Sequence, residues 1–131
     1  MRDIKLLLVD DEQRFLFTAE KILRRQGFDV LIAESGQDAL SQLKEHDVQL
    51  VILDVKMPGM DGIQTLKEIK HRYPHLEVIM LTGHATVPSA VEAMQMGASD
   101  YLMKPVAMDL LIKKALEAID RGRKTIGLNA I

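Results

Sequence analysis

The fold is decided by the stretch QLVILD at residues 49–54, which continues into VKMPGMDG at residues 55–62. The uninterrupted apolar run 50–53 predicts a short strand covered on both faces, as in a parallel sheet. Asp54 ends that strand, and the turn formers Pro58 and Gly59 follow it. A carboxylate in this position is expected to lie at the mouth of a pocket.

Working outward from this stretch, apolar runs alternate with segments of helical spacing. Strands are predicted at 4–9, 28–33, 49–53, 77–81 and 100–103. Strands that alternate with helices favour an α/β fold with right-handed crossovers. We expect a doubly wound, five-stranded parallel sheet of the flavodoxin-like (βα)5 type, with strand order 2-1-3-4-5.

The predicted helices carry recognisable start and stop signals. They include Gly27 after the first helix, Ser35 with Asp38 before the second, Asp61 and Pro74 around the third, Thr86 and Gly97 around the fourth. The last helix is expected over 108–121, where Met108, Leu111 and Ala115 share a face. Residues 1–121 are therefore predicted to form the domain, and 122–131, which lose helical periodicity, a C-terminal tail or linker.

Composition narrows the class of protein. A chain of 131 residues that is 47% hydrophobic is expected to form one folded domain. The net charge of −2 gives no indication of nucleic-acid binding, and the absence of cysteine excludes disulfides and thiolate metal sites. Apolar runs are too short to span a membrane, and Met1-Arg2-Asp3 leads directly into a strand, so we expect neither a membrane span nor a signal peptide. A cytoplasmic location is expected.

Acidic side chains follow two of the predicted strands. Asp10 and Asp11 end the strand 4–9, and Asp54 ends the strand 49–53. If these strands are neighbours, three carboxylates meet at one edge of the sheet and need a cation or a positive side chain to relieve their repulsion. Lys104, after the strand 100–103, can supply that charge. Thr82 and Gly83 follow the predicted strand 77–81, so they are expected at the same edge of the sheet.

Four motifs in order and spacing resemble one known family: VDDE at 9–12, LDVKMPGMDG at 53–62, LTGH at 81–84 and YLMKP at 101–105. Together they resemble the receiver (phosphoacceptor) domain of bacterial two-component response regulators, over roughly residues 3–121. The stretch 81–105 is most similar to receivers that precede the output domains of nitrogen-regulation-type transcriptional activators.

The resemblance implies a chemical role for each motif residue. Asp54 would be the phosphoacceptor, and Mg²⁺, with Mn²⁺ as an alternative, would bind directly to Asp11 and Asp54. Asp10 would act on the metal through water, and Lys56 would offer its backbone carbonyl. The domain would be a signalling domain rather than a turnover enzyme, although it would catalyse its own Mg²⁺-dependent phosphorylation and dephosphorylation.

The later motifs would bind the phosphoryl group and transmit its presence. Thr82, the Gly83 backbone N–H and Lys104 would contact phosphoryl oxygens, with Thr82 and Lys104 completing the catalytic group around Asp54. The resemblance also implies a cis peptide between Lys104 and Pro105. Thr82 and Tyr101 would form the switch, and Lys56 and His84, which flank the path of the attacking water, would modulate the lifetime of the phosphorylated state.

The implied partners follow from the same resemblance. They are a sensor histidine kinase or phosphotransfer protein, and either a second copy of the chain after phosphorylation or an output domain, with transcription as the expected output. The responsive surface would comprise the helix near 87–97, the strand 100–103 and the helix near 108–121. No direct nucleic-acid binding by this segment and no membrane contact are expected.

Other interpretations of the same residues stay open. A metal-dependent phosphohydrolase with an Asp nucleophile is the main alternative, but it would need a second acid two positions after the nucleophile, where this chain has Lys56. A flavodoxin-like binding module without chemistry would not need the clustered carboxylates. Asp10 or Asp11 could cap a helix, Thr82 could be a turn hydroxyl, and Lys104 a solvated charge. We interpret Asp61-Gly62 as structural, the histidines 46, 71 and 75 as solvated, and the methionines as core filling.

Overall fold

The computed structural model describes residues 4–57, 59–83 and 87–130. In the described chain, strands and helices alternate as predicted. The strands are β1 (Lys5–Val9), β2 (Asp29–Ala33), β3 (Leu50–Leu53), β4 (Glu77–Thr82) and β5 (Asp100–Met103). The helices are α1 (Gln13–Arg25), α2 (Gly36–Glu45), α3 (Gly62–Arg72), α4 (Val87–Gln95) and α5 (Met108–Ala130). The strands pair in parallel in the order β2-β1-β3-β4-β5, which confirms the predicted doubly wound fold.

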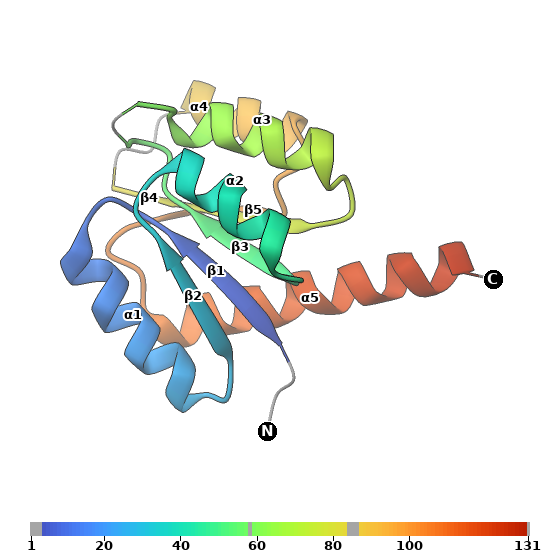
Figure 1. Ribbon diagram of the computed structural model, residues 1–131, viewed down its shortest axis with the longest axis horizontal. Helices are drawn as coiled ribbons and strands as arrows, with labels where there is room; N and C mark the ends of the chain where they lie inside the picture. The colour runs from blue at the N-terminus through green and yellow to red at the C-terminus, as the bar shows by residue number, and fades with distance from the viewer. Residues whose placement is uncertain (1–3, 58, 84–86, 131) are drawn as a thin grey trace.

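The sheet is covered by helices on both faces, with α1 and α5 on one side and α2, α3 and α4 on the other (Figure 1). Side chains that alternate along β1 fill two separate cores. Leu6 and Leu8 belong to the core beneath α1 and α5, and Leu7 and Val9 belong to the core on the other face. This two-sided burial explains why residues 6–9 of β1 and all of β3 are apolar without interruption.

Local signals position α3 against the end of β3. Asp61 caps α3, since its side chain accepts from the Gln64 backbone N–H at 2.9 Å while the Gln64 side chain accepts from the Asp61 N–H at 3.1 Å. A Cβ added to Gly62 would lie 2.0 Å from the carbonyl oxygen of Asp54. Only glycine allows this approach, so Asp61-Gly62 has the structural role predicted for it.

Two further predicted helix ends, the start of α2 and the end of α1, also hold. Ser35 caps α2 by accepting from the Asp38 N–H at 3.1 Å, and Gly27, with a φ of 94°, follows the end of α1. The proposed start of the fourth helix at Thr86 lies outside the described residues. Pro88 lies in the first turn of α4, where it costs no hydrogen bond.

The C-terminal segment differs from the expectation. Helix α5 does not end near Arg121 but continues to Ala130, and its last turns project beyond the sheet in Figure 1. Sequence periodicity failed here because a helix already formed extends by adding one hydrogen bond per residue, even past a glycine such as Gly122. The boundary of the domain at residue 121 stays a prediction.

Candidate functional site

Main-chain hydrogen bonds carry the sheet one residue past its strands and position the candidate side chains. The Asp54 N–H donates to the Val9 carbonyl at 2.9 Å, and the Lys104 N–H donates to the Thr82 carbonyl at 2.8 Å. Asp10 is held similarly by the carbonyl of Ala33 at 3.1 Å. These residues therefore all emerge at the carboxyl edge of the sheet, where doubly wound folds bind ligands.

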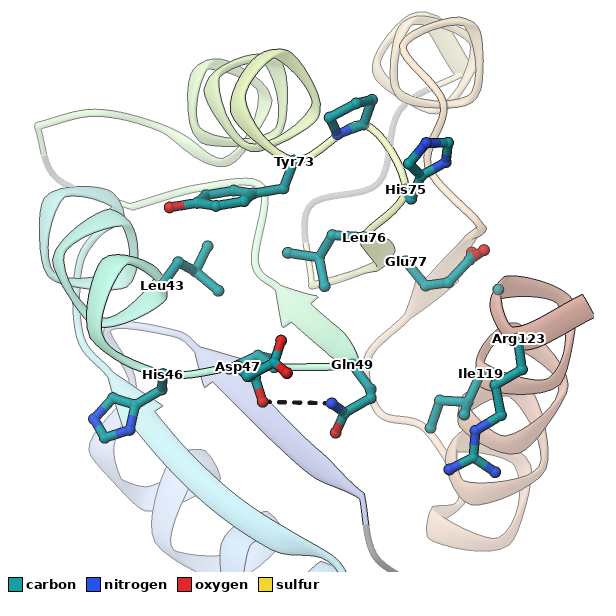
Figure 2. Close-up of a pocket in the computed structure, with 13 residues that line it drawn as sticks. Leu43, His46, Asp47, Gln49, Tyr73, His75, Leu76, Glu77, Ile119 and Arg123 are labelled. Carbon is teal, nitrogen blue, oxygen red and sulfur yellow. Dashed lines mark hydrogen bonds between the residues drawn. The ribbon is translucent and has the colours of Figure 1, made fainter. Parts of the chain in front are cut away.

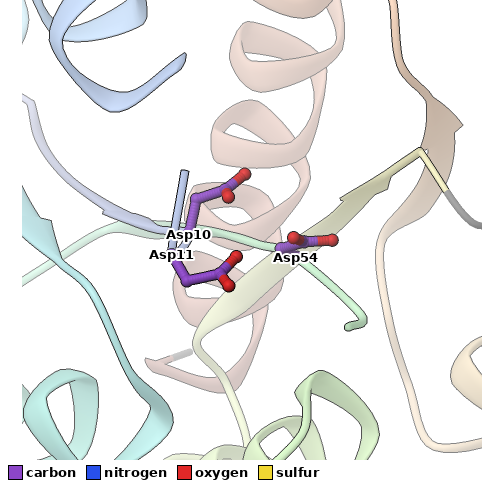
Figure 3. A group of neighbouring side chains, drawn as sticks. All are labelled: Asp10, Asp11 and Asp54. Atoms are coloured by element: carbon purple, nitrogen blue, oxygen red, sulfur yellow. The ribbon is translucent and has the colours of Figure 1, made fainter. Parts of the chain in front are cut away.

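The three predicted acids converge at this edge. Asp10 and Asp11 follow β1 and Asp54 follows β3, with one carboxylate oxygen from each within 4.8 Å of the others (Figure 3). Asp10 and Asp54 are buried, with 2% and 6% of their surface exposed, whereas Asp11 is exposed. A compact set of carboxylate oxygens suits a hard divalent cation such as Mg²⁺.

Lys104 is the positive side chain that the acid cluster requires. Its ammonium lies 2.5 Å from Oδ2 of Asp10 and 3.6 Å from Oε1 of Glu12. Only 16% of the Lys104 side chain is exposed, so it is not the solvated charge considered as an alternative. Asp10 also accepts from the Glu12 backbone N–H at 2.9 Å, so this acid both supports the start of α1 and pairs with Lys104.

The environment of Asp10 opposes its negative charge. Burial raises the pKa of its carboxyl above the ordinary value, and the nearby charge of Asp54 raises it further. The hydrogen bonds from Lys104 and from the Glu12 N–H lower the pKa but do not cancel these effects. A bound cation would favour the ionised carboxyl, so the site is electrostatically suited to metal binding.

A cavity of about 780 Å³ opens over the acids. It brings together most of the residues that the sequence analysis selected: Asp10, Asp11, Asp54, Lys56, Gly83, Lys104 and Pro105. The Lys104–Pro105 peptide is cis, as the resemblance implied. Thr82 lies at the end of β4, next to Gly83, and is fully buried. His84 lies outside the described residues.

Tyr101 lies on β5, on the side of the sheet that faces α4. The register pairs it with Met80, so the two-residue period of a strand places Tyr101 and Thr82 on the same face. Its ring is half-buried, and its hydroxyl lies 2.7 Å from Oγ of Ser89 in α4. The two residues predicted to form a switch thus share one face of the sheet.

The methionines follow the expectation only in part. Met57 and Met80 are buried, but Met94 on α4 and Met103 on β5 are 47% and 61% exposed. Val91 on α4 and Leu110 at the start of α5 are exposed as well, so α4, β5 and the start of α5 each carry an exposed apolar side chain. The sequence did not distinguish the exposed methionines from the buried ones, because the exposure of a side chain on α4 or on the edge strand β5 depends on which other elements cover it.

A second cavity, of about 450 Å³, lies at the opposite edge of the sheet (Figure 2). It is bounded by the ends of α2 and α3 and by α5, with Leu43, Tyr73, Leu76 and Ile119 among its lining residues. His46 and His75 border it and are exposed, as is His71 elsewhere on α3. Among the described residues, the side chains that lie close enough together to share a metal ion are Asp10, Asp11 and Asp54, and no histidine belongs to this group.

Two contacts to Lys104 were not anticipated. Besides Glu12, the ring of Phe15 lies against the ammonium, with 4.3 Å between Nζ and the ring centroid. Phe15 is partly buried on α1 and packs against the core shared by α1 and α5. No local pattern could show that the same ring also reaches a lysine at the end of β5.

Comparison with known proteins identifies the class to which this fold and site belong. Residues 6–116 match the response regulator receiver domain family. The chain belongs to this family, and it is a receiver, a signalling domain of response regulators.

Relatives with established names agree with this assignment. The transcriptional regulatory protein ZraR of Salmonella typhimurium is 42% identical over 122 residues, which are 93% of this chain but 28% of ZraR. A putative NtrX-like response regulator of Rickettsia bellii is 40% identical over 97% of this chain and 28% of its own length. The chain thus spans under a third of the length of these relatives.

Solved structures confirm the fold. A CheY-like response regulator receiver domain protein from Methanospirillum hungatei superposes with a TM-score of 0.90 at 31% identity, covering 93% of this chain and 98% of that one. NtrX from Brucella abortus superposes with a TM-score of 0.90 at 32% identity, covering 96% of this chain and 29% of that one. These findings give no support to the phosphohydrolase alternative. None of the described helices is long and apolar enough to cross a membrane.

Proposed function

We propose that Asp54 accepts a phosphoryl group from a sensor histidine kinase or a phosphotransfer protein. The observation that carries this proposal is the convergence of three acids and Lys104 around one cavity at the carboxyl edge of the sheet. A carboxylate oxygen of Asp54 attacks phosphorus, the bond to the donor breaks, and the donor leaves with the electron pair. In dephosphorylation water attacks the same phosphorus, and Asp54 leaves as a carboxylate.

The acids would hold the divalent cation on which this transfer depends. Asp11 and Asp54 are the proposed direct ligands, with Asp10 acting mostly through water and the backbone carbonyl of Lys56 as a further ligand. The set consists of oxygens alone, which fits Mg²⁺ and also Mn²⁺. Bound there, the cation would neutralise charge that develops on the transferring group.

The other side chains at the cavity would bind the phosphoryl oxygens. Lys104 lies at its wall as a compact cation, and the Gly83 N–H and the Thr82 hydroxyl are the proposed donors. The space beside Gly83 is open, because a Cβ added there would meet nothing within 4 Å, so it leaves room for a phosphoryl oxygen. Lys56, which lines the cavity and is exposed, and His84 would modulate the lifetime of the aspartyl phosphate.

The proposed output is a change at the surface of α4, β5 and α5. Movement of Thr82 toward the phosphoryl group would let the ring of Tyr101, on the same face, turn inward. The exposed apolar residues Val91, Met94, Met103 and Leu110 would then serve for homodimerisation or for docking an output domain. Control of transcription is the output that the name of the transcriptional regulatory protein ZraR favours, and a cytoplasmic location is part of the same proposal.

Intact mass spectrometry tests the phosphoacceptor directly. Incubation with acetyl phosphate and Mg²⁺ is expected to add one phosphoryl group to the wild type and none to Asp54→Asn. Asn retains the shape of the side chain but lacks the nucleophilic carboxylate. An adduct that persists in Asp54→Asn, or a wild type that stays unmodified, contradicts the proposal.

A further inference from the structure

We propose that Phe15 is a positioning residue for Lys104: its ring supports the ammonium at the wall of the cavity and keeps it available for the phosphoryl group. The inference rests on the proposed function of Asp54 and Lys104 and deepens it. It concerns a side chain of α1 that belongs to none of the four motifs.

The contact has the geometry of a cation–π interaction. Nζ of Lys104 lies 4.3 Å from the centroid of the Phe15 ring, within the distance of about 6 Å at which the negative face of a ring attracts an ammonium. The Lys104 side chain is only 16% exposed. Because water is largely excluded, the attraction is stronger here than on an open surface.

The remaining ion-pair partners of Lys104 are two acids, Asp10 and Glu12. Asp10, at 2.5 Å, belongs to the proposed metal site, and Glu12, at 3.6 Å, has a side chain that is 62% exposed and therefore screened by solvent. A carboxylate also repels a phosphoryl group. The ring of Phe15 attracts the ammonium without net charge, so it can support Lys104 without competing for the metal or opposing the phosphoryl group.

The ring itself is held in place by the fold. Phe15 is half-buried, lines the cavity and packs against the same core as Val106 and Met108, which also line it. Its helix begins beside the acids, since the Leu16 N–H donates to the Glu12 carbonyl at 3.1 Å. A rigid ring between the core and the cavity can therefore set the position of a flexible lysine.

The test compares Phe15→Leu with Phe15→Tyr in the full chain. Leucine keeps an apolar side chain but removes the aromatic face, whereas tyrosine keeps that face. Beryllofluoride, a mimic of the phosphoryl group, is expected to bind Phe15→Leu about fivefold more weakly than wild type at saturating Mg²⁺. Phe15→Tyr is expected to stay within about twofold of wild type. The control is Phe17→Leu on the same helix, because Phe17 is 54% exposed and binding is expected to be unchanged.

Two further measurements separate positioning from general damage. Mg²⁺ affinity, measured without beryllofluoride, is expected to be the same in wild type and Phe15→Leu. The NMR signals of the Lys104 ε-methylene protons, shifted upfield by the ring in wild type and Phe15→Tyr, are expected to lose that shift in Phe15→Leu. A parallel loss of Mg²⁺ affinity, no rescue by tyrosine, or an unaltered methylene shift overturns the inference.

Failure of this inference is distinguishable from failure of the proposed function. If wild type forms no adduct at Asp54 with acetyl phosphate, the proposed function fails and this inference fails with it. If wild type forms the adduct and Phe15→Leu binds beryllofluoride as tightly as wild type does, only the role of Phe15 is wrong.

Discussion

The charge balance at the carboxyl edge of the sheet depends on a few residues. Lys104 pairs with Asp10, the more deeply buried of the acids, rather than with the exposed Asp11. Because burial raises the pKa of Asp10, the folded state holds its proton more tightly than the unfolded state. The contribution of Asp10 to stability therefore decreases as the pH rises above the unfolded value of 3.8, and a bound cation would restore it.

Mg²⁺ is therefore expected to stabilise the fold through Asp11. At a free concentration of one hundred times Kd, binding to the native state alone adds about 2.7 kcal/mol to the free energy of unfolding. Thermal melts should show a higher Tm with Mg²⁺ in wild type and little response in Asp11→Ala. Asp47→Ala, which removes an exposed acid at the other end of the sheet, is the control and should respond as wild type does. An equal response in Asp11→Ala would exclude Asp11 as a ligand.

Gly62 is a second residue on which the site depends. In Gly62→Ala the new Cβ would lie 2.0 Å from the Asp54 carbonyl oxygen, so the backbone that carries the phosphoacceptor must shift. We expect a loss of about 1–3 kcal/mol in the free energy of unfolding, measured by urea denaturation. Gly83→Ala, where the Cβ meets nothing within 4 Å, should leave that free energy unchanged. If Gly62→Ala were as stable as wild type, the close approach to Asp54 would not require glycine at position 62.

At the scale of elements, the start of helix α3 is tied to the site through Gly62, which packs against the Asp54 backbone. It begins directly after the turn that follows Asp54, and its capping box satisfies N–H groups that have no partner within the helix. Because the capping box fixes the first residue of α3, it also fixes the end of the segment that connects Asp54 to this helix.

The cap of α3 can be tested by a conservative pair of substitutions. Asp61→Ala removes the acceptor for the Gln64 N–H and is expected to lower the free energy of unfolding by about 1 kcal/mol. Asp61→Asn keeps an acceptor oxygen and should lose much less. Chemical denaturation of both variants measures the difference, and equal losses would show that charge at the helix start, rather than the hydrogen bond, carries the effect.

The C-terminal helix illustrates how an element can exceed its sequence signal. Buried positions such as Leu111, Ala115 and Ile119 anchor α5 on the sheet, and the helix then continues to Ala130. Periodicity marks the part of a helix that is packed. It carries no information on how far an established helix propagates beyond that contact.

At the scale of the molecule, the proposed site and the proposed output surface lie on connected elements. Thr82 ends β4, β4 pairs with β5, and the hydroxyl of Tyr101 on β5 contacts Ser89 of α4. A local change at the phosphoryl group could thereby shift the population of a second arrangement of α4 and β5.

Beryllofluoride with Mg²⁺ is accordingly expected to change the association state of the chain. Sedimentation velocity should show a larger dimer fraction in wild type, with altered amide exchange across 87–105. Asp54→Asn, which lacks the acceptor carboxylate, is the control and should show neither change. If wild type keeps its association state and its amide exchange in that region, the switch is absent or lies elsewhere.

The sequence by itself determined the elements and the chemistry at their ends. Short apolar runs and helical stripes are local patterns, so the strands, most helix ends and the doubly wound class followed from them. The acids after 4–9 and 49–53 and the lysine after 100–103 were predictable too, because parallel strands end at one edge. The motifs around Asp54 and Lys104 then indicated the receiver family.

Only the tertiary structure decided which of those groups touch one another. Lys104 pairs with Asp10, 94 positions away in the sequence, and rests on the ring of Phe15. Met94 and Met103, predicted as core filling, are exposed because no described element covers that face of α4 and β5. Such contacts depend on how helices pack on a sheet, which side-chain periodicity does not encode. A local pattern specifies which residues face inward, whereas the partner that each one meets is set by distant parts of the chain.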